Sequence, residues 1–277
     1  MKKTVKISMI FMLVLTGLFL FLIAPRMTAK PDMSAFKGVK FAHRGYFDNL
    51  NNIPENSLES FEKAIENGYG IELDVQLSSD GVAMVFHDAD LERMTGYTGK
   101  VWEYTAEELG KMKLLGTDRT IPTLAQAMEL ISGRTPVIVE YKMDRVDTAV
   151  CEKSYEILAD YTGDWCMKSF DPRAVMWYRQ NAPQVIRGQL AQEYWKVEKY
   201  KGSPLYTALS FLVSNVVTRP DFISYKYTDS DNISLKLCKI MGADIACWTL
   251  RNADDYAQVK GKFDMYIFDS FDINTVE

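Results

Sequence analysis

The chain has 277 residues, of which 47% are apolar and 25% are charged, a composition typical of a globular protein with a large core. Residues 1–30 carry five basic residues and no acidic one, so residues 31–277 hold 27 basic against 37 acidic residues, a net charge of −10. This acidity excludes the electropositive surface that binding to a nucleic-acid backbone requires. Any phosphate that the protein handles must therefore meet a local positive charge or a metal ion.

The chain begins with an apolar segment. Lys2, Lys3 and Lys6 precede 18 residues without charge, from Ile7 to Ala24. As a helix these would span roughly 27 Å, close to the hydrocarbon core of a bilayer, whereas a signal peptide usually has an apolar region of about 7–15 residues. We predict that residues 1–30 are a single-pass anchor in the cell membrane, with the lysines in the cytoplasm and the rest of the chain outside. A cleaved signal peptide and a secreted protein are the alternative.

Short apolar runs and amphipathic stretches alternate through the rest of the chain. Amphipathic stretches such as 57–68 and 123–133 end in glycine and predict helices. About eight strand–helix units predict an α/β fold, a (β/α)₈ TIM barrel over residues 39–277, joined to the anchor by a linker at 31–38. A doubly wound sheet is the competitor, but no glycine-rich dinucleotide motif follows the first run. The strand-like runs lie at 39–42, 71–77, 82–86, 137–141, 165–169, 185–190, 222–225, 243–249 and 264–268.

The chain contains only two histidines, and each follows an apolar run. His43 stands in the motif HRG with Arg44 and Gly45, and His87 follows the run at 82–86. Enzymes with this barrel carry their chemistry at the C-terminal ends of the strands. Because imidazole titrates near neutral pH, we predict that His43 and His87 form a general acid and base pair. A structural role for either histidine is the alternative.

Two pairs of charged residues, in two different strand-like runs, each have the spacing of one strand face. Glu72 and Asp74 are two residues apart in IELDVQL, so they point the same way, and Glu140 and Lys142 repeat this spacing in VEYK. Carboxylates that face a barrel interior are unfavourable unless a positive charge lies between them. Ca²⁺ or Mg²⁺ would supply it, so Glu72, Asp74 and Glu140 predict a metal site, with Lys142 placed to meet an anionic substrate. A solvent-facing strand is the alternative.

Seven motifs follow one another along the chain: HRG, PENS, IELDVQLSSDG, FHDADLERMTG, VEYK, SF and WTL. In this order they resemble the glycerophosphodiester phosphodiesterase family, from about Phe41 to the C-terminus. The resemblance implies a phospholipase-C-like phosphodiesterase barrel that hydrolyses glycerophosphodiesters to sn-glycerol 3-phosphate and an alcohol. It also implies the site residues: His43 and His87 as acid and base, Ca²⁺ or Mg²⁺ held by Glu72, Asp74 and Glu140, and phosphate bound by Arg44 and Lys142.

Two further residues are expected at the edges of the site. Glu55 in PENS would be a further ligand or hydrogen-bond partner, with capping of the next helix as an equal alternative. Trp248 stands where the chain departs from the family pattern, because the usual asparagine after WT is replaced by Arg251 or displaced to Asn252. This departure leaves the choice of substrate open.

The segment at 205–222 is unusually apolar and follows an aromatic-rich stretch. One interpretation is an outer helix of the barrel. The other is a hydrophobic lip that receives an acyl chain or touches the membrane, which would make lysophospholipids substrates in a lysophospholipase D-like reaction. A membrane-anchored binding protein without catalysis is a less favoured alternative, because every expected histidine and carboxylate is present.

Overall fold

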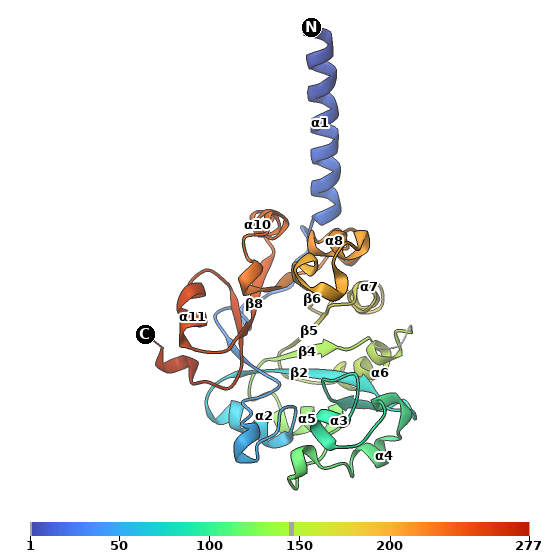
Figure 1. Ribbon diagram of the computed structural model, residues 1–277, viewed down its shortest axis with the longest axis vertical. Helices are drawn as coiled ribbons and strands as arrows, with labels where there is room; N and C mark the ends of the chain where they lie inside the picture. The colour runs from blue at the N-terminus through green and yellow to red at the C-terminus, as the bar shows by residue number, and fades with distance from the viewer. Residues whose placement is uncertain (1, 144–146, 277) are drawn as a thin grey trace.

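The computed structural model shows an N-terminal helix and eight parallel strands closed into a barrel, and it describes residues 2–143 and 147–276 (Figure 1). The strands are β1 (Lys40–His43), β2 (Gly70–Leu77), β3 (Ala83–Val85), β4 (Val137–Tyr141), β5 (Trp165–Ser169), β6 (Arg187–Ala191), β7 (Phe222–Lys226), β8 (Asp244–Leu250) and β9 (Met265–Phe268). The α-helices are α1 (Lys2–Ile23), α2 (Leu58–Glu66), α3 (Glu92–Thr95), α4 (Ala106–Leu109), α5 (Leu124–Ile131), α6 (Ala149–Leu158), α7 (Pro172–Asn181), α8 (Pro204–Ser210), α9 (Asn215–Thr218), α10 (Ile233–Ile240) and α11 (Ala253–Val259). The strand order and the pairing of β1 with both β2 and β9 confirm the predicted TIM barrel.

Strand β3 lies outside the barrel, unlike the other predicted strands. It pairs antiparallel with β2, with Val75 opposite Val85. Its direction follows from the short connection between Leu77 and Ala83, because a parallel crossover needs about a dozen residues or more. His87 therefore follows a hairpin strand and not a barrel strand, and it reaches the site from beside β2.

Side chains cap the predicted helices at their starts. Ser57 at α2 and Thr123 at α5 each accept a hydrogen bond from the backbone N–H three residues further on. These caps satisfy N–H groups that have no partner inside the helix. The two helices confirm the elements predicted at 57–68 and 123–133, and their buried faces pack on the outside of the strands.

The N-terminal half of the barrel interior is filled by apolar side chains. Phe41 and Phe222 project inward beside Gly70 and Gly188, where a Cβ would lie 2.5 Å and 2.2 Å from the phenylalanine rings. Glycine at these positions therefore makes room for the large rings. Phe36, from the segment before β1, packs against the same cluster. The four cysteines all lie in the described part of the chain and are buried and unpaired.

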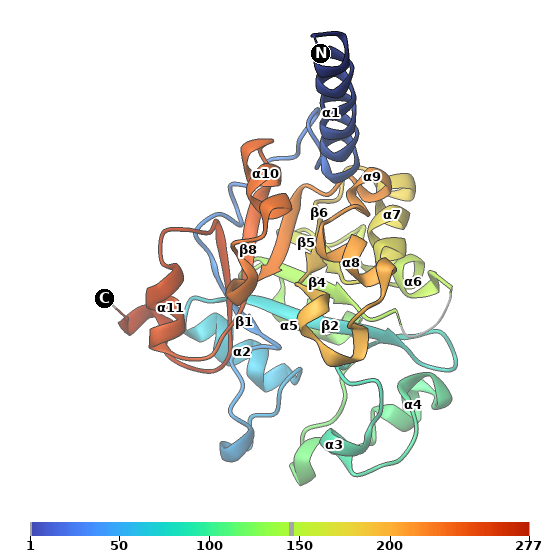
Figure 2. The same cartoon turned by 45° about the horizontal axis from the view of Figure 1, so that its top comes forward.

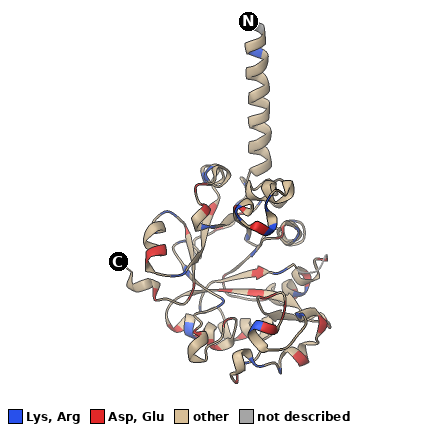
Figure 3. Cartoon of the chain, in the orientation of Figure 1, with Lys and Arg blue, Asp and Glu red and all other residues tan. Residues whose placement is uncertain are grey.

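Helix α1 projects away from the barrel and packs against it by its last turn (Figures 1 and 2). The segment Thr4–Ile23 is long and apolar enough to cross a membrane, and Figure 3 shows almost no charge along it. Ile23 is fully buried in a cluster with residues of α10 and of the loop before α9. Asn215 donates a hydrogen bond of 2.7 Å to the Ile23 carbonyl, and Arg219 donates one of 2.8 Å to the Ala24 carbonyl. Side chains of the barrel thus satisfy the last carbonyls of the helix.

Candidate active site

Polar side chains replace the apolar ones at the C-terminal end of the barrel interior. Each polar residue lies two positions after an apolar interior residue of the same strand, so the two side chains point to the same face of that strand. This alternation makes the top of the barrel charged although its base is a hydrophobic core. The pairs are Phe41 and His43, Ile138 and Glu140, Cys166 and Lys168, Ala246 and Trp248, and Ile267 and Asp269.

The register of the strands brings the three predicted metal ligands together. His43 lies opposite Glu72 across β1 and β2, and Asp74 lies opposite Glu140 across β2 and β4. The three carboxylates are almost completely buried. Each offers an oxygen within 4.8 Å of the oxygens of the other two. The predicted trio therefore forms one cluster.

Two lysines neutralise part of this negative charge. The Lys142 ammonium lies 2.9 Å from Asp74 and also contacts Glu140. The Lys168 ammonium lies 3.0 Å from Glu72 and 3.2 Å from Glu140. Burial alone would raise the pKa of Asp74 and of Glu140, but the nearby cations, Lys142 first among them, hold both pKa values below their usual range. Asp74 and Glu140 are thus ionised inside the barrel.

The donor set of the cluster fits a divalent cation. Glu72 Oε1 and Asp74 Oδ1 are buried and accept no hydrogen bond, although lysine ammonium groups lie 3.0 Å and 2.9 Å from them. Each carboxylate oxygen has two lone pairs, so a contact with one ammonium group leaves it able to bind a cation as well. Carboxylate oxygens are the ligands that Ca²⁺ and Mg²⁺ prefer. The cluster therefore fits the kind of ion that the sequence predicts.

Arg44 stands beside the cluster on a tight turn after β1. Its φ is +62° and that of Gly45 is +79°, a conformation that favours glycine. A Cβ on Gly45 would also lie 2.3 Å from the hydroxyl oxygen of Ser60, so no larger residue fits. Arg44 donates a hydrogen bond of 2.7 Å to Glu55, and its Nε lies 3.7 Å from Asp74. The turn therefore holds the guanidinium next to the carboxylates.

The PENS motif supports the site through separate contacts. Glu55 accepts two hydrogen bonds from Arg93, of 2.6 Å and 3.1 Å. Asn56 donates one of 2.9 Å to Asp74, and Ser57 caps α2. Of the roles considered for Glu55, the structure shows that of a hydrogen-bond partner, to Arg44 and Arg93, and the helix cap is Ser57.

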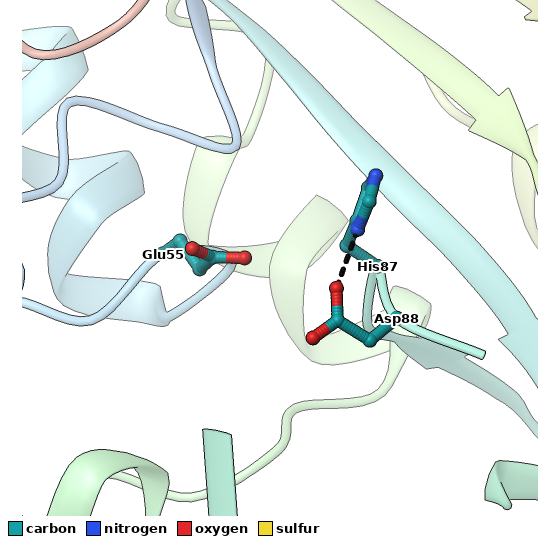
Figure 4. Close-up of side chains that lie close together, drawn as sticks. All are labelled: Glu55, His87 and Asp88. Carbon is teal, nitrogen blue, oxygen red and sulfur yellow. Dashed lines mark hydrogen bonds and ion pairs between the residues drawn. The ribbon is translucent and has the colours of Figure 1, made fainter. Parts of the chain in front are cut away.

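Each histidine ring is held by a carboxylate. His43 Nδ1 lies 2.6 Å from Asp269 Oδ1, and His87 Nδ1 lies 2.8 Å from Asp88 Oδ1 (Figure 4). Figure 4 shows the second ring nitrogen of His87 pointing away from Asp88. Because Nδ1 is engaged, Nε2 is the atom through which each ring can exchange a proton. Both histidines line one cavity of about 140 Å³, here called the site cavity, which also includes Arg44 in its wall.

The two histidine partners are ionised. Burial would raise the pKa of Asp88, but hydrogen bonds from His87 and Arg93 outweigh it and lower that pKa well below its usual range. Burial acts on Asp269 in the same way, and the hydrogen bond with His43 again lowers the pKa. An ionised carboxylate accepts from Nδ1–H, so it fixes the tautomer and orientation of the ring.

Glu55, His87 and Asp88 form a second group whose ligand atoms lie within 4.8 Å of one another (Figure 4). The Arg93 guanidinium bridges the two acids, at 2.6 Å from Glu55 and 2.5 Å from Asp88. Arg44 also lies 2.7 Å from Glu55, so two cations of the chain face these two acids. Asp88 is the member of the group that contacts His87.

Trp248 lies in the wall of the site cavity, as expected of a residue at the edge of the site. Its indole N–H donates a hydrogen bond of 3.2 Å to the Ser224 carbonyl, and its ring packs edge-to-face on Phe170 with centroids 5.4 Å apart. Arg251 also lines the cavity, with its Nε 3.6 Å from Asp269. The residue that departs from the family pattern thus stands beside a histidine partner.

A wider groove of about 720 Å³ continues from the site cavity and shares Glu140, Lys142 and Phe170 with it. The segment 205–222 is not one outer helix: α8 lines the groove, and α9 packs against α1 and α7. Leu205 is 64% exposed at the rim. The apolar and aromatic residues of the far wall are Tyr194, Tyr200, Leu205, Tyr206 and Leu209.

Sequence reasoning missed three charged residues of the site. Lys168 carries the same signal as Glu140, a charged residue two positions after an apolar strand residue, but only the pairing of β4 with β5 shows its partners. Asp269 follows the last strand, and closure of the barrel brings it to His43. Asp88 is adjacent to His87 in sequence, and this adjacency could have indicated that Asp88 is the hydrogen-bond partner of His87.

Comparisons with known sequences agree on one family. The sequence model of the glycerophosphoryl diester phosphodiesterase family matches residues 43–273. A glycerophosphodiester phosphodiesterase of Caldanaerobacter subterraneus subsp. tengcongensis is 32% identical over 191 residues, which cover 61% of this chain and 76% of that protein. Glycerophosphodiester phosphodiesterase 1 of Homo sapiens is 26% identical over 258 residues, which cover 83% and 77%.

Solved structures share the barrel. A glycerophosphodiester phosphodiesterase of Thermotoga maritima has a TM-score of 0.66 and 28% identity, with 84% of this chain and 94% of that chain covered. A phosphodiesterase of Oleispira antarctica, solved in complex with the product sn-glycerol-3-phosphate, has a TM-score of 0.70 and 23% identity over the same shares. The second likeness concerns the fold alone.

Proposed function

Because the chain belongs to the glycerophosphoryl diester phosphodiesterase family of hydrolases, we propose that His43 and His87 are the acid and base with which it cleaves glycerophosphodiesters. The products would be sn-glycerol 3-phosphate and an alcohol. The observation that carries this proposal is the pair of histidines, each held at Nδ1 by a carboxylate, in the wall of one cavity. Both histidines and all three carboxylates of the cluster are present, which argues against the catalytically inactive binding protein.

The substrate phosphate is proposed to lie between the histidines and the carboxylate cluster. Arg44 and Lys142 both line the site cavity, so their charged groups can contact phosphoryl oxygens there. A divalent cation, Ca²⁺ or Mg²⁺, held by Glu72, Asp74 and Glu140 would add positive charge at the same oxygens. Lys168 also lines the cavity, but it is 2% exposed and pairs with Glu72 and Glu140, so its proposed task is to keep the carboxylates in place.

Proton transfer would use the free Nε2 atoms of the two rings. One histidine takes the proton of the substrate's own glycerol hydroxyl, whose oxygen attacks phosphorus to give a cyclic phosphate. The other histidine gives a proton to the departing alcohol as the bond between its oxygen and phosphorus breaks. Water then opens the cyclic phosphate with the two roles exchanged. Each proton lost by one group is taken up by another.

The test of this proposal is hydrolysis of glycerophosphocholine by the full chain in neutral detergent. We expect activity with Ca²⁺ or Mg²⁺, loss of activity with a chelator, and a fall of about 10²- to 10⁴-fold in His43→Ala or His87→Ala. Wild-type turnover by either variant would refute the acid and base assignment. Full turnover in the chelator would refute the metal requirement.

A second candidate substrate class is the lysophospholipids, which the groove favours. Its Tyr200 and Tyr206 rings lie 4.0 Å apart between centroids and, with Leu205, form an apolar surface that an acyl chain could cover. We expect turnover of lysophosphatidylcholine as well as glycerophosphocholine. Leu205→Ser should lower turnover of the lipid several-fold through lost apolar contact and leave the water-soluble substrate unaffected. Absence of lipid turnover in the presence of metal would exclude this class.

We also propose that α1 anchors the protein in the cell membrane as a single-pass helix, with the barrel on the extracytoplasmic side. Its length and its exposed apolar surface support an anchor. The alternative is signal cleavage and a secreted barrel. We expect to find the protein in the membrane fraction with the mass of the full-length chain. The barrel should be cleaved by protease added outside the cell. A shortened chain in the medium would contradict it.

A further inference from the structure

Four arginines surround a cavity at the base of α1, here called the arginine cavity. It has a volume of about 560 Å³ and shares no lining residue with the site cavity or the groove. Phe21 of α1 and the segment 24–29 that follows the helix form one wall. Residues in and near α7 and α9 form the other wall, and Figure 2 shows these two helices close to the base of α1. The arginines are Arg26, Arg179, Arg187 and Arg219.

The positive charge of this cavity is largely uncompensated. Among the described residues, Asp221 is the carboxylate that pairs with any of the four arginines. It lies 3.4 Å from Arg26 and 3.7 Å from Arg187. Arg179 and Arg219 donate to backbone carbonyls, which carry no net charge. Burial lowers the pKa of Arg219, and the neighbouring Arg179 lowers it further, as expected of cations held together.

Arg187 supplies a second, independent observation. It is 3% exposed, and its Nη1 makes no hydrogen bond but lies 3.7 Å from Asp221 Oδ2. Its Nε donates to the Thr218 carbonyl at 3.2 Å and its Nη2 to the Arg219 carbonyl at 2.9 Å, so the guanidinium is held firmly. At 3.7 Å, Asp221 compensates this buried charge only in part. Arg187 therefore adds a fixed positive charge to the wall of the cavity, and this charge favours an anion there.

The arginine cavity lies at the level where α1 leaves its apolar span. Phe21, within the candidate membrane segment, lines the cavity, and the Arg219 guanidinium stacks over its ring at 4.8 Å. Arg26 lies three residues after the end of that segment. In a membrane-spanning chain this is the depth of the lipid phosphates.

We propose that the arginine cavity binds the phosphate of an anionic phospholipid head group. One guanidinium group can bind two phosphate oxygens through two parallel N–H···O bonds. The summed positive charge of four such groups around one cavity exceeds the negative charge of a single lipid phosphate. The apolar surface of Phe21 provides a place for the first carbons of an acyl chain. The inference rests on the proposed membrane anchor. Free phosphate offers the same chemistry, so the experiment must separate the two.

The test measures lipid binding by the full chain in neutral detergent, by native mass spectrometry, with a chelator to stop turnover and excess glycerophosphocholine to fill the site cavity. The probes are short-chain phosphatidylserine, phosphatidylcholine with the same acyl chains, and inorganic phosphate. We expect phosphatidylserine to bind about tenfold more tightly than phosphatidylcholine, and inorganic phosphate to compete weakly. Equal binding of the two lipids, or inorganic phosphate that competes as well as the lipid, would overturn the proposal.

The variants locate the binding. Arg26→Gln with Arg179→Gln should abolish the preference for phosphatidylserine and keep wild-type hydrolysis of glycerophosphocholine. Arg134→Gln is the control, because Arg134 forms an exposed ion pair with Glu62 and neither residue lines the arginine cavity. This variant should keep the preference for phosphatidylserine. Arg179→Gln alone serves if the double variant does not fold, since Arg179 is exposed. A preference unchanged in the arginine variants, or lost in the control, would overturn the proposal.

A failure of lipid binding in the arginine cavity can be distinguished from a failure of α1 to anchor the protein. Binding in detergent does not depend on where α1 lies in the cell or on whether it is cleaved there. Lipid binding by the full chain as expected, together with a secreted, shortened chain in cells, would support the cavity and contradict the anchor. A membrane-bound chain without a lipid preference would do the opposite.

Discussion

The site cavity and the arginine cavity gather cations in two different ways. In the site cavity, Lys142 and Lys168 lie among three buried carboxylates. In the arginine cavity, one carboxylate, Asp221, is shared by a cluster of four guanidinium groups. The first arrangement keeps carboxylates ionised inside a barrel and available to a metal, and the second leaves a net charge that attracts an anion. Charge balance, and not the number of cations, separates the two sites.

The largest expected effect comes from removing the deepest cation of the site cavity. Lys168→Met leaves Glu72 and Glu140 without the ammonium that lies 3.0 Å and 3.2 Å from them. Breaking such a buried pair should lower the free energy of unfolding by about 3–5 kcal/mol, measured by denaturant titration. Added Ca²⁺ or Mg²⁺ should restore part of the loss, because the cation takes the place of the lost charge.

The control is Lys113→Met, which removes a lysine from an exposed pair with Asp118 and should leave the free energy of unfolding nearly unchanged. A Lys168→Met protein as stable as the wild type would show that the balance of charges in the barrel does not contribute to stability.

A smaller effect is expected at the carboxylate that holds the first histidine. Asp269→Asn removes the ionised acceptor 2.6 Å from His43 Nδ1, so the ring is free to adopt the other tautomer. Turnover of glycerophosphocholine should fall by up to about 100-fold, a part of what the acid and base pair contributes. The loss should appear in kcat more than in KM, because Asp269 acts through His43.

Asp254→Asn, on the exposed first turn of α11, is the matched control and should turn over glycerophosphocholine at the wild-type rate. Equal activity of Asp269→Asn and the wild type would remove Asp269 from the set of positioning residues.

The smallest effect is a difference in pH dependence between one aspartate of each region. The pKa of Asp88 lies below its usual 3.8, so its contribution to stability is present above that pH and is lost as the pH falls through the folded-state pKa. Burial raises the pKa of Asp221 above 3.8 despite its arginine partners, so its contribution becomes less favourable as the pH rises through the folded-state pKa.

Stability curves from pH 3 to pH 7 for Asp88→Asn and Asp221→Asn test this contrast. Relative to the wild type, the stability lost in Asp88→Asn should shrink toward acid pH, whereas that lost in Asp221→Asn should grow. Slopes of the same sign for the two variants would contradict the difference in charge balance between the two regions.

Most of the site was predictable because its residues follow a local rule. Glu72 and Asp74 share one face of β2 by the period of two, Glu140 and Lys142 repeat this spacing at β4, and the motif order places both strands in one barrel. The barrel itself follows from the alternation of strand-like and helix-like segments. These features need only neighbouring residues, which the sequence shows directly.

What was missed depends on contacts between distant segments. Asp269 reaches His43 only through closure of the barrel, and the direction of β3 depends on the length of a turn. The arginine cavity combines Arg26 with arginines that lie more than 150 residues later, and no spacing in the sequence connects them. Long-range packing of this kind becomes visible only in three dimensions.

If α1 spans the membrane as proposed, the burial of Ile23 sets the geometry of the barrel relative to the bilayer. Its carbonyl is hydrogen-bonded by Asn215, and the backbone N–H of Arg26 donates to the Pro220 carbonyl at 2.9 Å, so α1 and the barrel are joined rigidly. For a helix that spans the membrane, this joint fixes the height and tilt of the catalytic opening above the lipid surface. Each residue inserted into α1 would turn the barrel by about 100° and shift it by about 1.5 Å.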